Sequence, residues 1–273
     1  MISAKPLQPK TDESGGGIFT GERLVADDPL FAADMSRHLV AYRFAQKRVA
    51  GRMVLDAGCG DGYGTHLLAE TALGALGVDR SADTIALARR RYARENLRYE
   101  ACDLASLDCL GARFDVVCNF QVLEHLVDPL PFLLQVRAVL REGGTFILTT
   151  PNRAMAVIEI PYHVHEYVAD ELQTLLASIF AQVEVKGVVG DERAMSYERT
   201  RIRSAQRILA LDPLNLRRLV PNSLIEFAYP HLARWVRRSV RRNEGSTRPV
   251  SVDNFTISDN CDEALDLLAL CHL

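Results

Sequence analysis

The feature that most constrains the fold is a run of glycines directly after a short apolar segment. Residues 53–57 (MetValLeuAspAla) have the length and apolar character of a buried strand, and Gly58, Gly60, Gly62 and Gly64 follow at alternate positions. A strand that enters closely spaced glycines and then a helix brings backbone N–H groups close to a ligand without interference from Cβ atoms. The sequence therefore predicts a ligand-binding loop at the carboxyl edge of a sheet.

The spacing of these glycines separates two kinds of cofactor. A dinucleotide loop needs the pattern GxGxxG, but Tyr63 occupies the sixth position counted from Gly58. The pattern GxGxG does fit at Gly58, Gly60 and Gly62. The next apolar run ends at Asp79, 21 residues after Gly58, where a carboxylate can accept hydrogen bonds from both ribose hydroxyls. These positions favour an adenosine-containing cofactor other than a dinucleotide.

Short apolar runs alternate with helical patterns along much of the chain. Strands are expected at 53–57, 75–78, 114–119, 145–150 and 182–189, and helices at 65–72, 82–95, 129–140 and 169–179. This alternation is typical of βαβ units on a parallel sheet, so we expect an α/β, Rossmann-like fold. A last apolar run, 264–270, has the length of a strand, with a short buried helix as the alternative.

Composition divides the chain into parts. We expect a disordered tail at 1–17, N-terminal lid helices at 18–50, a core at 51–189 and 263–273, and an Arg-rich helical cap at 190–262. No apolar stretch of signal-peptide length opens the sequence, and no apolar run reaches 18 residues. We therefore expect a cytoplasmic protein without a transmembrane segment.

The net charge of −3 conceals an uneven distribution. Residues 191–250 carry 13 arginines and 6 acidic residues, whereas residues 1–190 and 251–273 are each net −5. Three interpretations of this basic segment stay open: a cap with solvated arginines, a cap that binds an anionic acceptor, and peripheral contact with anionic lipid. Nucleic acid is disfavoured because no aromatic residues alternate with the arginines.

Five blocks, in the same order, resemble the class I S-adenosylmethionine-dependent methyltransferases of the type 11 and ubiquinone-methyltransferase-like group. They are VLDAGCGDGYG at 54–64, Asp79, CysAspLeu at 102–104, FDVVCNFQVLEH at 114–125 and LREGGTFILTTPN at 140–152. The resemblance implies a seven-stranded sheet of order 3-2-1-4-5-7-6 whose last strand is antiparallel. The cap would then be an insertion between strands 6 and 7. The implied cofactor is S-adenosylmethionine, with S-adenosylhomocysteine as the product.

Position by position, the resemblance also implies the cofactor contacts. The glycines would pass under the methionine and the ribose, Asp79 would hold the ribose hydroxyls, and Asp103 would accept a hydrogen bond from the adenine amine. Asp56 either contributes to this site or holds the loop as a buried acid, and Arg23 or Arg43 is a candidate for the cofactor carboxylate. The full set of cofactor-binding candidates is Asp56, Gly58, Gly60, Gly62, Asp79, Arg80, Asp103, Leu104, Asn119 and Gln121.

Histidines supply the candidate catalytic groups. Methyl transfer to a hydroxyl needs an aligned acceptor and a base, and histidine titrates near neutral pH. His163 and His165 lie in ProTyrHisValHisGluTyr (161–167), which follows the fifth strand and is expected over the cofactor pocket. Two alternatives are that these histidines hold the loop by hydrogen bonds to the backbone, or that they bind a metal together with Glu166. We expect no metal. His125 is a third catalytic candidate, with capping or cofactor packing as its alternative.

The sequence thus predicts a methyltransferase that acts on oxygen. The implied acceptor is a hydroxyl of a sugar, a glycan or a small metabolite, because ThrGlyGluArg (20–23) resembles an actinobacterial subset associated with glycans and secondary metabolites. The acceptor would be anionic if the cap arginines bind it. Two alternatives stay open: N- or C-methylation of a small molecule, and a catalytically inactive partner protein that binds S-adenosylmethionine.

Overall fold

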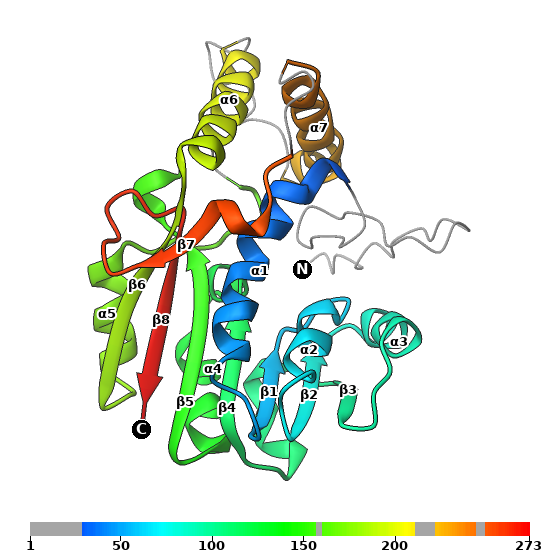
Figure 1. Ribbon diagram of the computed structural model, residues 1–273, viewed down its shortest axis with the longest axis vertical. Helices are drawn as coiled ribbons and strands as arrows, with labels where there is room; N and C mark the ends of the chain where they lie inside the picture. The colour runs from blue at the N-terminus through cyan, green and yellow to red at the C-terminus, as the bar shows by residue number, and fades with distance from the viewer. Residues whose placement is uncertain (1–28, 157–159, 211–221, 244–248) are drawn as a thin grey trace, which may run out of the picture.

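The computed structural model describes residues 29–156, 160–210, 222–243 and 249–273. One mixed sheet of eight strands lies between two layers of helices (Figure 1). The strands are β1 (Met53–Ala57), β2 (Gly74–Asp79), β3 (Leu97–Ala101), β4 (Phe114–Phe120), β5 (Leu140–Pro151), β6 (Gln182–Gly190), β7 (Phe255–Ser258) and β8 (Asp266–His272). The α-helices are α1 (Ala32–Gln46), α2 (Tyr63–Leu68), α3 (Ala82–Arg91), α4 (Leu130–Val139), α5 (Ala169–Ala177), α6 (Glu192–Leu209) and α7 (Asn222–Asn243).

The strand order is β3-β2-β1-β4-β5-β8-β6-β7. The first five strands pair in parallel, and β8 inserts antiparallel between β5 and β6. With β8 as the seventh strand of the predicted sheet, the order 3-2-1-4-5-7-6 is confirmed. The run at 264–270 is therefore part of a strand and not a helix, and its apolar residues are buried because the sheet continues on both sides of β8.

Two strands differ from the prediction. β3 was missed because it lies at the sheet edge, where only Leu97 and Tyr99 are buried and the residues between and after them are exposed. A strand of this kind is short and largely polar, so it lacks a clear apolar run. β7 pairs antiparallel with the end of β6, so residues 190–262 are not wholly helical.

The core forms on both faces of the sheet. Alternate strand residues point to opposite faces, so Leu55 and Phe146 pack with the side chains of α4 and α5, whereas Val54 and Ile147 pack with those of α1 to α3. The helices α6 and α7 lie beyond the carboxyl ends of the parallel strands (Figure 1). In the described ranges, we find no helix that is both long enough and apolar enough to cross a membrane.

Gly62 closes the turn between the glycine loop and α2. It is the N-cap residue of α2, with φ of 92°. A Cβ atom at this position would lie 2.8 Å from both the Cβ of Ala88 and the hydroxyl of Tyr99. Both the backbone conformation and the close packing therefore require glycine.

We expect Gly62→Ala to lower the free energy of unfolding by about 2–4 kcal/mol, since strain and steric overlap both act. Gly111→Ala is the matched control, because its φ is 61° but a Cβ there meets no atom within 4 Å. Its loss should be about 1–2 kcal/mol, from the backbone alone. Urea unfolding measures both, and equal losses would contradict the packing role of Gly62.

Candidate functional site

A cavity of about 560 Å³ lies between the carboxyl edge of the sheet and the cap. Its walls include the glycine loop, the ends of β2 and β4, the loop that follows β5, helix α1 and residues of α6 and α7. The volume is in the range of small-molecule sites, about 300–1,000 Å³. The cap thus forms one wall of the site, and the strand ends form the other.

Seven of the ten predicted cofactor residues line this cavity. They are Gly58, Gly60, Asp79, Arg80, Asp103, Leu104 and Gln121. At Gly58, where φ is 88°, a Cβ atom would lie only 2.6 Å from the side chain of Val122. The loop is anchored to β2, because the N–H groups of Gly58 and Cys59 donate to the carbonyl of Val78 at 2.8 and 2.9 Å.

Two carboxylates at this end of the cavity are oriented by backbone hydrogen bonds. Oδ1 of Asp79 accepts from the N–H of Ser81 at 2.8 Å. Oδ1 of Asp103 accepts from the N–H of Ala105 at 2.8 Å and caps the short helix η2 (Leu104–Leu110). One oxygen of each carboxylate is therefore held by a backbone hydrogen bond. A side chain that positions a ligand needs to be held in this way.

The other three predicted cofactor residues lie behind the cavity wall. Asp56 is buried and accepts hydrogen bonds from Thr65 Oγ1 at 2.6 Å and from the Tyr42 hydroxyl at 3.2 Å. Asn119 is buried, and its Nδ2 donates to the carbonyl of Ala57 at 2.7 Å. Together with Gly62, these residues hold the loop in shape and do not line the cavity.

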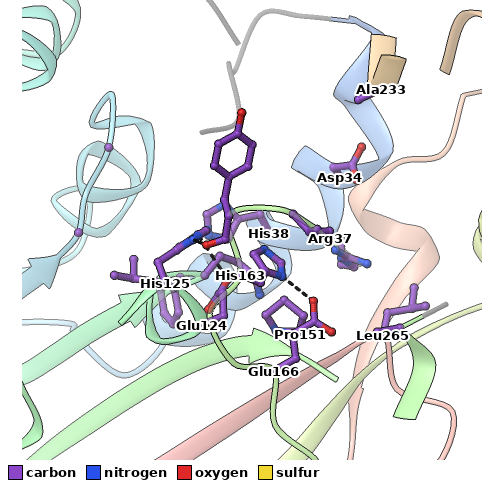
Figure 2. A pocket seen from close by; sticks show the side chains of 18 of the residues that line it. Asp34, Arg37, His38, Glu124, His125, Pro151, His163, Glu166, Ala233 and Leu265 are labelled. Carbon is purple, nitrogen blue, oxygen red and sulfur yellow. Dashed lines mark hydrogen bonds and ion pairs between the residues drawn. The ribbon is translucent and has the colours of Figure 1, made fainter. Parts of the chain in front are cut away.

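Two histidines and a glutamate of the cavity wall lie together (Figure 2). Nδ1 of His163 lies 2.5 Å from Oε1 of Glu166. His125, in the short helix η3 (Leu123–His125), has its Nδ1 2.9 Å from the carbonyl oxygen of Tyr162. The two imidazole rings meet edge to face, with centroids 5.1 Å apart. The structure thus brings two of the three catalytic candidates together.

The third candidate, His165, is not brought to this cavity. Its side chain is 50% exposed, and its Nε2 lies 3.7 Å from a carboxylate oxygen of Glu171. Alternate residues of an extended segment would point the same way, but the carbonyl of Glu124 accepts from the N–H groups of both Val164 and His165. This local turn separates the directions of His163 and His165.

Glu124 is the most deeply buried acid beside His125 and His163, with 1% of its surface exposed. Burial raises its pKa to about 8, although Thr150 Oγ1 donates to its Oε2 at 3.1 Å. Glu124, His125 and His163 have ligand atoms within 4.8 Å of one another, so these three residues could hold a metal ion.

Three arginines that line the cavity form ion pairs, and one of these pairs, Arg237 with Asp34, connects the cap to helix α1. Arg237 of α7 donates to both oxygens of Asp34 at 3.0 Å, and Arg37 lies 2.9 Å from Asp266 of β8. Arg201 of α6 donates to Glu198 at 2.7 Å. Each of these three cavity-lining arginines therefore faces a carboxylate.

Helix α1 lies where the sequence predicts a lid helix, but sequence reasoning did not single out Asp34 or Arg37 as residues of the cavity. Asp34, Arg37 and His38 line it, and their spacing of three to four residues along a helix was the available signal. Burial lowers the pKa of His38 to about 4, so this ring is neutral near pH 7. Arg43 instead pairs with Asp253 on the surface, and Arg23 lies outside the described residues.

The ionisation of Asp56 gives a testable pH dependence of stability. Burial raises its folded-state pKa to about 6 from 3.8, against the hydrogen bonds from Thr65 and Tyr42. The stability that this group contributes is complete below pH 4 and is lost as pH rises through 6. Relative to Asp56→Asn, the wild-type free energy of unfolding should fall by up to about 3 kcal/mol between pH 4 and 7.

Asp115→Asn is a control of opposite sign for the same measurement. Burial acts to raise the pKa of Asp115, but hydrogen bonds from Arg141 and the N–H of Met53 outweigh it and lower the pKa. The stability deficit of Asp115→Asn should therefore grow as pH rises through the acid range below about 4 and stay constant between pH 4 and 7. Denaturant unfolding at several pH values measures both trends, and a constant difference between wild type and Asp56→Asn would refute the effect.

Comparisons with known proteins agree with this architecture. Residues 49–200 match the family model described as "Methyltransferase domain". A protein of Mycolicibacterium smegmatis named "Probable S-adenosylmethionine-dependent methyltransferase" is 41% identical over 173 residues, which are 60% of this chain and 65% of that protein. A "Ubiquinone biosynthesis O-methyltransferase" of Cereibacter sphaeroides is 32% identical over 158 residues, covering 51% of this chain and 64% of that protein.

A solved structure supports the fold over most of the chain. The crystal structure of an S-adenosylmethionine-dependent methyltransferase, possible histamine N-methyltransferase, from Thermotoga maritima superposes with a TM-score of 0.55. It covers 89% of this chain and 91% of that chain, at 12% identity. The sequence relatives are matched over less than two thirds of their own length. The family match spans more than half of this sequence, and the chain therefore belongs to the class I S-adenosylmethionine-dependent methyltransferases.

Proposed function

We propose that this protein transfers the methyl group of S-adenosylmethionine to a hydroxyl oxygen of a sugar or another small metabolite. The observation that carries the proposal is one cavity that both the glycine loop and the His163–Glu166 pair line. The similarity to ubiquinone biosynthesis O-methyltransferases supports oxygen as the methylated atom. The cytoplasm stays the expected compartment, on the sequence grounds given above.

The residues present fit the cofactor. The loop leaves no room for a Cβ at Gly58, so its backbone can approach a ligand closely. Asp79 stands at the end of β2, beside the loop, where it can accept from ribose hydroxyls, and Asp103 with Leu104 lies where adenine would be held. Gln121 lines the cavity after β4, and the resemblance implies that it would contact the sulfonium end. The bound cofactor supplies a methyl carbon that its sulfonium group activates toward a nucleophile.

His163 then acts as the base for the acceptor hydroxyl. Its Nδ1 is 2.5 Å from Glu166, and a carboxylate only accepts hydrogen bonds, so Nδ1 carries the proton and Nε2 is left to take one. With the cofactor bound, Nε2 of His163 would take the proton that the acceptor hydroxyl loses, while the cofactor would supply the methyl group to the oxygen and keep the electrons of the broken C–S bond on its sulfur. Glu166 fixes the ring orientation and stabilises the resulting imidazolium.

The charges of the cavity favour an uncharged acceptor. Arg201 and Arg237 of the cap and Arg37 of α1 line the cavity, and each faces a carboxylate where an anionic acceptor would need a free positive charge. Apolar side chains of the cavity can contact the carbon skeleton of the acceptor; they are Met155, Ile160, Ile202 and Leu232. Contact with a lipid surface is a separate prediction, for which Trp235, 57% exposed on α7, is the anchor.

Cofactor binding is tested with Asp79→Asn. Loss of a charged acceptor should weaken S-adenosylmethionine binding by about tenfold to a hundredfold, since hydrogen bonds to charged groups contribute about 1.5–3 kcal/mol. Asp83→Asn is the control, because Asp83 is exposed on α3 and does not line the cavity. Isothermal titration calorimetry measures both. Absence of binding by the wild type at millimolar cofactor would overturn the proposed function.

The base is tested by comparing His163→Gln with His165→Gln. Turnover of His163→Gln should fall by about 10²–10⁴-fold, while its cofactor affinity is retained, because only the proton acceptor is lost. His165→Gln should retain turnover, since His165 lies outside the cavity.

Turnover is followed with ¹³C-methyl S-adenosylmethionine and a panel of sugars and small alcohols, with amines and phenolic rings for comparison. The ¹³C shift of the product separates O-, N- and C-methylation. Wild-type turnover in His163→Gln would exclude the base, and transfer to nitrogen or carbon alone would replace the oxygen acceptor. Cofactor binding without transfer to any acceptor would favour the inactive partner protein.

A further inference from the structure

Glu124, His125 and His163 form a compact group of metal-ligand side chains on the cavity wall. One ligand atom from each residue lies within 4.8 Å of the other two. In the described ranges, no other group of three or more His, Cys, Asp or Glu side chains comes this close. The group joins two segments, since η3 follows β4 and His163 lies in the loop after β5. It is thus a product of the fold and not of one local sequence.

Both imidazoles carry their proton on the same nitrogen. A carbonyl oxygen can only accept, so the contact between His125 Nδ1 and the Tyr162 carbonyl places the proton on Nδ1. Glu166 does the same for Nδ1 of His163. Each ring therefore has a lone pair on Nε2. Metal-binding histidines show this arrangement, in which one nitrogen donates to a carbonyl or carboxylate and the other binds the ion.

The carboxylate of Glu124 completes a set of two histidines and one acid. Oε2 accepts from Thr150, whereas Oε1 lies 4.0 Å from Nε2 of His125, too far for a hydrogen bond. Ligands of one tetrahedral zinc ion lie about 3.4 Å apart, given metal–ligand distances of about 2.1 Å. Closing the group around an ion therefore needs movements of about 1 Å. Glu124 is buried, and Nε2 of His125 lies beside its carboxyl group.

We propose that Glu124, His125 and His163 bind one divalent transition-metal ion of the Zn²⁺ class, with a fourth position open to the cavity. Three protein ligands and one open position, with nitrogen and oxygen donors, suit this class of ion. The consequence for activity rests on the proposed function, since the ion would take the Nε2 that His163 needs as a base. The loaded protein should therefore bind S-adenosylmethionine but transfer its methyl group slowly.

Metal binding is tested first without any turnover. Co²⁺ replaces Zn²⁺ as a spectroscopic probe, in a Cys109→Ser background, because Cys109 Sγ lies 3.9 Å from Cys102 Sγ and the two thiols could bind the ion themselves. We expect about one Co²⁺ per chain, with the visible absorption of a tetrahedral site and no thiolate band. Zn²⁺ should displace it. No absorption, or a spectrum unchanged by the variants below, would overturn the inference.

The variants His125→Gln and Glu124→Gln should each abolish the Co²⁺ spectrum, and Glu166→Gln should weaken Co²⁺ binding by about 10–100-fold. His165→Gln is the control, and its Co²⁺ affinity should equal that of the parent. Binding of S-adenosylmethionine shows whether each variant is folded. If Glu124→Gln does not fold, the test rests on His125→Gln. These readouts do not depend on an acceptor, so they separate failure of the metal site from failure of the proposed function.

With an acceptor identified, Zn²⁺ should lower turnover at least about tenfold, and EDTA should restore it. The ratio of turnover without and with Zn²⁺ should approach one in His125→Gln. If the Zn²⁺-loaded parent turns over as fast as the metal-free parent, or faster, the ion does not inhibit. The Co²⁺ spectrum then still tests whether the metal site exists.

Discussion

The buried carboxylate of Asp56 is the interaction on which the site depends. It accepts from Thr65 in α2 and from Tyr42 in α1, so one side chain at the end of β1 connects three elements. Tyr42 packs directly on Gly64, where any Cβ would overlap its ring. The position of α1 is therefore set by the loop itself. Because Asp34, Arg37 and His38 are on that helix, the cavity wall beside the cofactor loop follows from the same contact.

Charge is distributed along the sequence so that it balances in the fold. The basic segment 191–250 supplies Arg237, and its partner Asp34 lies 203 residues earlier in the acidic part of the chain. Arg37 of that part in turn pairs with Asp266, which belongs to the acidic C-terminal segment. These pairs are largely buried, so breaking one would leave an uncompensated charge. Arg237 thus holds the cap to the core, and both pairs reduce the positive charge available to an acceptor.

The residues that contact the two cavity histidines determine how their rings are oriented and protonated. Tyr162 and Glu166 decide which ring nitrogen carries the proton, and the carbonyl of Glu124 turns the backbone between His163 and His165. One nitrogen of His163 is therefore presented to the cavity in a defined state. The same geometry suits a proton acceptor and a metal ligand, and the two roles exclude one another at that atom.

The sequence alone determined the α/β class, the strand order through the family resemblance, and the seven cofactor candidates that line the cavity. These features depend on local spacing: glycines directly after a strand, and an acid at the end of the next one, reach the same sheet edge in any parallel arrangement. The edge strands β3 and β7 were not predicted from the sequence because exposed residues interrupt their apolar pattern.

Only the tertiary structure decided which residues meet across the cavity. It separated Asp56, Gly62 and Asn119 from the lining, removed His165 from the site, and joined His163 to Glu166 and His125. It also paired Arg237 of the cap with Asp34, and Arg37 of α1 with Asp266, across more than 200 residues of sequence. The physical reason is that side-chain direction, burial and charge pairing depend on neighbours contributed by distant segments, and residue spacing along one chain does not contain that information.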